Sequence, residues 1–158
     1  MCPSWMVHDL EELATMSANS RALARRLPDW VPVAASVRER GFTQRYVATG
    51  IRAVGVVIAT ASVRGYRTRG RSAFHQNILL GFGLHGLGHI SMSLLARGYT
   101  SGVATTPTVV IPFWLWASRE LQQAGVPNRR SLRAAIALTA GTIAGARLAA
   151  YAITKNQP

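Results

Sequence analysis

The chain has 158 residues, enough for one domain of ordinary size and too few for two, so we expect a single domain over residues 1–158. Hydrophobic residues make up 49% and charged residues only 15%, below the roughly 25% usual in soluble domains, which favours a membrane protein. The formal net charge of +12 arises from 17 Arg and one Lys, but these Arg gather between apolar runs, which favours flanks of membrane spans over a nucleic-acid surface.

The single cysteine excludes proteins with intrachain disulfides and multi-cysteine metal proteins, and the first residues argue against a secreted protein with a cleavable signal peptide. Cys2 has no partner for an intrachain disulfide and cannot take part in a multi-cysteine metal site. The opening residues lack a basic region followed by a long apolar core, so no cleavable signal peptide is predicted. We expect the protein's own spans to direct it to the cell membrane as a multi-pass protein.

An acidic stretch near the N-terminus organises the prediction of function. Residues 5–13 read Trp-Met-Val-His-Asp-Leu-Glu-Glu-Leu and hold three of the six acidic residues. On a helix, Glu11 and Glu12 follow His8 by three and four residues, so the imidazole and both carboxylates point roughly the same way, and Asp9 points elsewhere. An acidic first turn also suits the positive end of any helix, so a purely structural role stays open.

Four apolar runs follow, separated by short segments that carry arginines. The first run, interrupted only by Arg52, has about the length of a spanning helix of roughly 20 residues, and the third run is broken by Pro107 and Pro112. Within the last run Gly141 and Gly145 form a GxxxG pair, which lets another helix approach closely. We predict an all-α fold, a small helical membrane bundle with about four apolar helices plus an N-terminal helix that carries the acidic motif; a compact soluble helical bundle is the alternative. The runs cover residues 46–63, 73–96, 103–118 and 132–153.

The second run carries three of the four histidines. His85 and His89 are four residues apart and share one helix face, and ionisable residues inside a span normally line a site or a polar pathway. His75 is better explained as an interhelical hydrogen-bond partner. A histidine and glutamates from one helix that meet a histidine pair from another can hold a metal, or can form an acid–base set without one. The candidate catalytic residues, and equally the candidate ligands of a divalent transition metal, are His8, Glu11, Glu12, His85 and His89.

Three further polar residues are candidate substrate contacts. Asn77 is a second polar group in the second run. Arg52 lies inside the first run, where it either pairs with Glu11 or Glu12 as a buried charge or holds an anionic substrate group. Tyr99 follows Gly98 and either caps the connection at the membrane interface or donates a proton.

These residues carry a resemblance to a known family. His8-Asp9-Leu10-Glu11-Glu12 resembles the His-x-x-Glu-Glu signature of the HXXEE-domain family of predicted bacterial multi-span membrane proteins. The stretch from His89 through Arg97-Gly98-Tyr99 to Thr105 and Pro112 is similar to that family's second block. The resemblance covers most of residues 5–118 and implies that His8, Glu11, Glu12 and His89 matter together; it implies no reaction. In the family an apolar helical stretch usually precedes the signature, whereas here seven residues do, so we expect a short first helix half in the membrane or a shortened start.

Three functions are compatible with these patterns. The leading hypothesis is an integral-membrane enzyme that acts on a lipophilic small molecule by His/Glu acid–base chemistry, of isomerase or cyclase type. The second is a metal-dependent membrane oxygenase or hydrolase that uses the same residues as ligands. The third is a transport or accessory subunit with a proton relay. The expected partners are the lipid bilayer, a lipophilic small molecule and, for an oligomer, further copies of the chain; no nucleic acid is expected.

Overall fold

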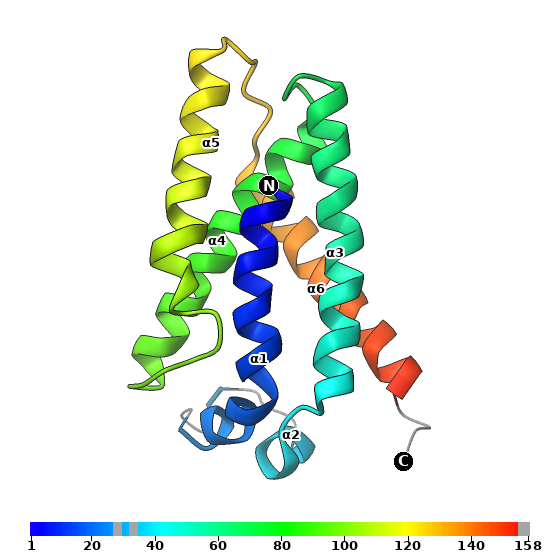
Figure 1. Cartoon of the computed structure of the whole chain (residues 1–158), viewed down its shortest axis with the longest axis vertical. Coiled ribbons are helices and arrows are strands. Elements are labelled where there is room, and N and C mark those ends of the chain that lie inside the picture. Colours follow the sequence, from blue (N-terminus) through cyan, green and yellow to red (C-terminus); the bar gives the residue numbers. More distant parts are fainter. Residues whose placement is uncertain (27–29, 32–34, 155–158) are drawn as a thin grey trace.

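The structure is a computed structural model that describes residues 1–26, 30–31 and 35–154 (Figure 1). Across these ranges it contains helices and no strand, which confirms the predicted all-α fold. In chain order the elements are α1 (Cys2–Arg26), α2 (Ala35–Arg40), α3 (Gln44–Arg67), α4 (Ala73–Leu95), the π-helical turn η1 (Thr106–Val110), α5 (Ile111–Gln123) and α6 (Leu132–Thr154).

Three of these helices, α3, α4 and α6, are long and apolar enough to cross a membrane. The third predicted run, residues 103–118, does not add a fourth long helix, because it is divided between η1 and the 13-residue α5. Pro107 and Pro112 lie at the first turns of these two elements, and neither has the backbone N–H that would close a regular α-helical hydrogen bond there. The wider π-helical turn accommodates this interruption, and such turns are frequent at functional sites.

Small side chains bring the long helices together. α3 packs against α6, α1 and α4, and α4 also packs against α6. Ala61, Ala135 and Ala150 are fully buried, and a side chain at Gly81 of α4 would meet Thr139 of α6. Close backbone approach through such residues is how membrane helices associate. The predicted GxxxG pair does not serve this purpose within the described chain, because no neighbouring atom lies within 4 Å of a Cβ built at Gly141 or Gly145.

The first helix is held alongside α3 over much of its length. The indole of Trp5 packs on Gly55, and the Cys2 thiol donates to the Ser62 hydroxyl at 3.2 Å. Further along, the Gln44 amide donates to the Leu13 carbonyl at 2.8 Å. In Figure 1 α1 lies between α3 and the α4–α5 side of the bundle. This placement turns the face of α1 that carries His8 and Glu12 towards α4 and η1.

Candidate functional site

A cluster of buried and partly buried histidine and glutamate side chains lies between α1 and α4. His8 and Glu12 come from α1, and His85 and His89 come from α4. One nitrogen or oxygen atom of each residue can be chosen so that all four atoms lie within 4.8 Å of one another. His8 is fully buried, and Glu12 is 7% exposed. The N-terminal acidic motif and the later histidine pair therefore meet in space, as the sequence predicted.

The facing atoms of this cluster are close. His89 Nε2 lies 2.9 Å from His85 Nε2 and 3.2 Å from Glu12 Oε1. The ring centroid of His8 lies 4.9 Å from that of His89 and 5.6 Å from that of His85. Nitrogen and oxygen atoms that share a tetrahedral zinc ion lie about 3.3 Å apart, since each is about 2.0–2.1 Å from the metal. The spacing in the cluster thus suits one shared cation or a short chain of hydrogen bonds.

A hydrogen-bond chain sets the protonation of His8. His8 Nδ1 lies 2.8 Å from Thr105 Oγ1, and the same hydroxyl donates to Glu11 Oε2 at 2.6 Å. Because the hydroxyl has a single proton and gives it to the carboxylate, it must accept from His8 Nδ1–H. A neutral ring then has a bare lone pair on Nε2. This Nε2 is buried and has no hydrogen-bond partner among the described residues.

Glu11 is held outside the cluster, and this differs from the prediction that it joins Glu12. Its carboxylate accepts from the backbone N–H of Thr105 at 2.8 Å and of Ala104 at 3.2 Å, and from the Tyr99 hydroxyl at 2.6 Å. Glu11 therefore ties the segment that precedes η1 to α1. Whether it also acts as an acid or base stays a prediction.

The surroundings displace the pKa values of the ionisable groups of α1. Burial alone would raise the pKa of Glu11, but the hydrogen bonds from Thr105, Tyr99 and Ala104 lower it to about 2. Burial, with a smaller contribution from the neighbouring Glu11 charge, raises the pKa of Glu12 to about 7. Burial lowers the pKa of His8 to about 4, so its ring is neutral at pH 7, in agreement with the free Nε2 lone pair.

A hydrogen bond to the second ring nitrogen, Nδ1, orients the ring of His89. It is hydrogen-bonded to the backbone of Ser101, and because Nε2 faces the cluster, this bond falls to Nδ1. Gly102 follows with φ of +86°, and a Cβ built there would lie 2.7 Å from His89 Cε1 and 2.8 Å from His8 Cε1. The 101–105 segment therefore supports two of the three rings. A histidine whose other nitrogen is fixed in this way is the usual arrangement around metal ions.

The other candidate residues lie away from this cluster. Asn77 is buried and bonds to the backbone of Arg129 and Ser131, so it holds the loop before α6; its contact with a substrate stays a prediction. Arg52 is exposed on α3, and Glu12 pairs with His89 instead of with it. The Tyr99 hydroxyl donates to Glu11 at 2.6 Å and is linked to the site through that carboxylate. His75 bonds the Ala61 carbonyl of α3 at 3.1 Å, which confirms its interhelical role.

Two residues that matter to the site were not predicted as such. Thr105 orients His8, and Gly102 leaves the space that the His8 and His89 rings fill. Both lie in the connection that resembles the second block of the HXXEE family, and this resemblance is the sequence signal that could have singled them out. Without the resemblance, a glycine three residues before a threonine is a weak signal, because such residues are common in any turn.

Across the described residues, the fold and the cluster define a small all-helical protein with three potential membrane spans and a set of three histidines and one glutamate, of which His8 and Glu12 are buried. The sequence model of a family described as "protein of unknown function with HXXEE motif" matches residues 1–117, and the chain belongs to this HXXEE family. The match covers α1, α3, α4 and η1, and so every residue of the cluster. Comparison with curated proteins found no match, and comparison with solved structures found none either.

Proposed function

We propose that this protein is a multi-pass enzyme of the cell membrane that uses a divalent transition metal, held by His8, Glu12, His85 and His89, to act on a lipophilic small molecule. The reaction is of the hydrolase or oxygenase type. Three imidazoles and a carboxylate form a donor set that suits zinc, iron or copper more than magnesium or calcium. Because α4 is a potential membrane span, an apolar substrate can reach the cluster from the bilayer side.

The observation that carries the proposal is the unpartnered Nε2 of His8. A buried nitrogen without a hydrogen bond costs about 1–3 kcal/mol, so its burial needs a compensating interaction. The chain from Glu11 through Thr105 fixes the lone pair on this atom, and a lone pair requires either a proton donor or a cation. His85 and His89 also turn Nε2 atoms towards each other, which favours a shared cation between them.

The chain's own residues would have separate tasks. Glu12 and the three histidines bind; Thr105 and the Ser101 backbone orient the His8 and His89 rings. Glu11 keeps its negative charge near neutral pH and would balance part of the positive charge of a bound metal. When bound, the metal would supply Lewis-acid or redox chemistry to the reaction. Burial between α1 and α4 excludes bulk water from the reacting groups.

A second candidate, acid–base catalysis of isomerase or cyclase type without metal, has one specific observation in its favour. Hydrogen bonds run from Tyr99, which is 42% exposed, through Glu11 and Thr105 to the buried His8. Such a chain could carry a proton between the surface and the cluster. In this case His89 and Glu12 would exchange the proton with the substrate.

Metal analysis separates the two candidates. The protein, extracted in a mild detergent without chelators, should contain about one transition-metal ion per chain, as expected for one four-ligand site. Inductively coupled plasma mass spectrometry measures this ratio and identifies the element. Zinc would support a hydrolase, and iron would support an oxygenase. A protein that is folded, carries no metal and takes up none on titration with zinc or iron would leave the acid–base candidate.

Replacement of Thr105 by valine should weaken metal binding by about 10–100-fold, the usual effect of losing an outer partner of a metal-binding histidine. Valine keeps the shape of the side chain but removes the hydroxyl that accepts from His8 and donates to Glu11. The measurement is competition with a chelator of known affinity.

Thr108→Val is the matched control for this replacement. Within the described part of the chain, the exposed Thr108 hydroxyl bonds the Ala104 carbonyl alone, at 2.9 Å. Its loss should leave metal affinity within about twofold, because ordinary surface substitutions change free energies by less than about 0.5 kcal/mol. Equal affinities for the two variants would contradict the assigned role of Thr105.

A further inference from the structure

A hollow of about 540 Å³ is lined mostly by arginines. It lies at the end of the bundle that is opposite α2 (Figure 1). It lies where α3 ends, α4 begins and the loop before α6 passes. Thr68 and Ser72 line it as well, and no acidic residue does. The five arginines are all exposed and are Arg64, Arg67, Arg69, Arg71 and Arg129.

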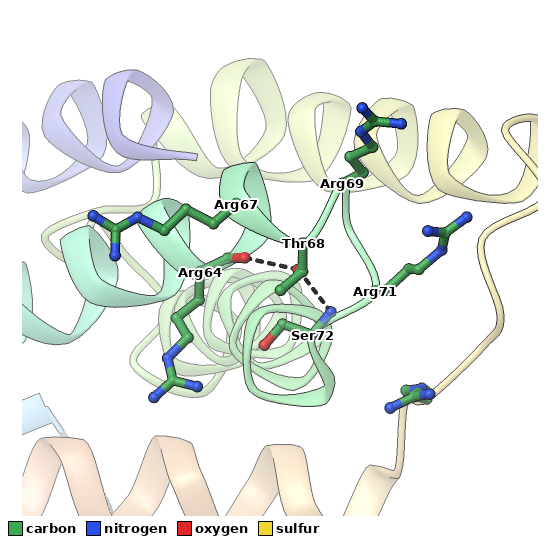
Figure 2. Close-up of a pocket in the computed structure, with 7 residues that line it drawn as sticks. Arg64, Arg67, Thr68, Arg69, Arg71 and Ser72 are labelled. Atoms are coloured by element: carbon green, nitrogen blue, oxygen red, sulfur yellow. Dashed lines mark hydrogen bonds between the residues drawn. The ribbon is translucent and has the colours of Figure 1, made fainter.

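These arginines have no counter-charge within the described part of the chain. None of the five makes a side-chain ion pair there. Figure 2 shows Arg64 and Arg67 extending to one side of Thr68, and Arg69 and Arg71 to the other. Guanidinium groups spread in this way suit several oxygen atoms over a surface more than one small enclosed ion.

Buried amides hold the two loops of this hollow together. Gln76 is 2% exposed; its amide donates to the carbonyls of Gly70 at 2.9 Å and Pro127 at 3.0 Å, and its oxygen accepts from Arg129 N–H at 2.8 Å. Asn77 accepts from Ser131 N–H at 2.8 Å. The turn after α3 and the loop before α6 are thus one preorganised unit, and the backbone hydrogen bonds bring Arg129 to the same hollow as Arg71 although no acidic residue lines it.

We propose that this arginine-lined hollow binds the phosphate-bearing headgroup of an anionic phospholipid. Three potential membrane spans begin or end at this level, so the arginines lie where lipid headgroups lie. Arginines near an anionic membrane surface attract its lipids, and a guanidinium binds a phosphate through two parallel hydrogen bonds. Free phosphate shares this chemistry but lacks acyl chains that could contact the exposed apolar faces of α3 and α6.

The test uses the full chain in a neutral detergent with phosphatidylglycerol, phosphatidylcholine or inorganic phosphate as the added probe. Phosphatidylglycerol should bind and raise the thermal midpoint, whereas phosphatidylcholine and inorganic phosphate should have much smaller effects. The double variant Arg71→Gln/Arg129→Gln should bind phosphatidylglycerol about 30-fold more weakly, because each arginine near an anionic lipid surface contributes about 1 kcal/mol. Both side chains are exposed, so the variant should fold.

The matched control is Arg52→Gln/Arg147→Gln, which removes the same charge from exposed positions on α3 and α6 that do not line the hollow. It should keep phosphatidylglycerol binding within about threefold, since only long-range attraction is lost. An equal loss in both double variants would overturn the proposal in favour of general charge attraction. Inorganic phosphate that reproduces the whole thermal shift would overturn it in favour of a site for soluble anions. Neither result depends on the metal cluster.

Discussion

His89→Ala should abolish stable metal binding and lower affinity by more than about 100-fold. Loss of an outer partner already costs about 10–100-fold, and a direct ligand contributes more. His89 is the central member of the cluster, because its Nε2 lies within 3.2 Å of both His85 Nε2 and Glu12 Oε1. Removing it also leaves Glu12 without the partner that compensates its burial. Metal content after purification and chelator competition measure the effect.

His75→Ala is the control for this variant. His75 lies on the same helix and is also partly buried, but it bonds the Ala61 carbonyl and lies outside the cluster. It should therefore lose some stability and keep its metal. His89→Gln, which retains more of the side-chain volume, guards against a folding defect of the alanine variant. Should His89→Gln be folded and still bind metal with wild-type affinity, His89 is not a ligand.

The sequence predicted the members of the cluster better than their individual tasks. His85 and His89 follow the four-residue spacing of one helix face, which depends on local geometry alone. Around a helix, Glu11 and Glu12 lie about 60° and 40° from the direction of His8, on opposite sides of it. Helix periodicity therefore cannot decide which of the two glutamates joins His8 in the cluster. The choice is made by tertiary neighbours: Glu12 faces α4, and Glu11 faces the backbone of residues 104 and 105.

The supporting residues of the site could not be predicted for the same reason. Thr105 is 97 residues from His8, and the contact exists only once α1 packs beside η1. The interruption of the third apolar run is different, because Pro107 and Pro112 mark it in the sequence; only the π-helical form of the turn could not be predicted. Arg52 was predicted to be a buried charge or a substrate contact because it lies inside an apolar run. In the structure it lies on the exposed face of α3, where a long side chain can reach water.

Gly102→Ala should disrupt the cluster as severely as the loss of a ligand, although Gly102 has no functional group. Its φ of +86° is unfavourable for alanine, and the new Cβ would lie 2.7–2.8 Å from carbon atoms of the His89 and His8 rings. Relief of this overlap requires both rings to move, and Thr105 and the Ser101 backbone would then no longer fix them. We expect metal affinity to fall about 100-fold, together with a lower thermal midpoint.

Gly125→Ala separates the backbone effect from the contact with the rings. Gly125 also has a positive φ, of +63°, but a Cβ built there meets no atom within 4 Å. In both variants the alanine in the left-handed backbone conformation should lower the free energy of unfolding by about 1–2 kcal/mol, and only Gly102→Ala should displace the histidines. If the two variants lose equal stability and both keep full metal affinity, the rings tolerate the extra methyl group. In that case the lone pair of His8 is not held as tightly as the proposed metal site requires.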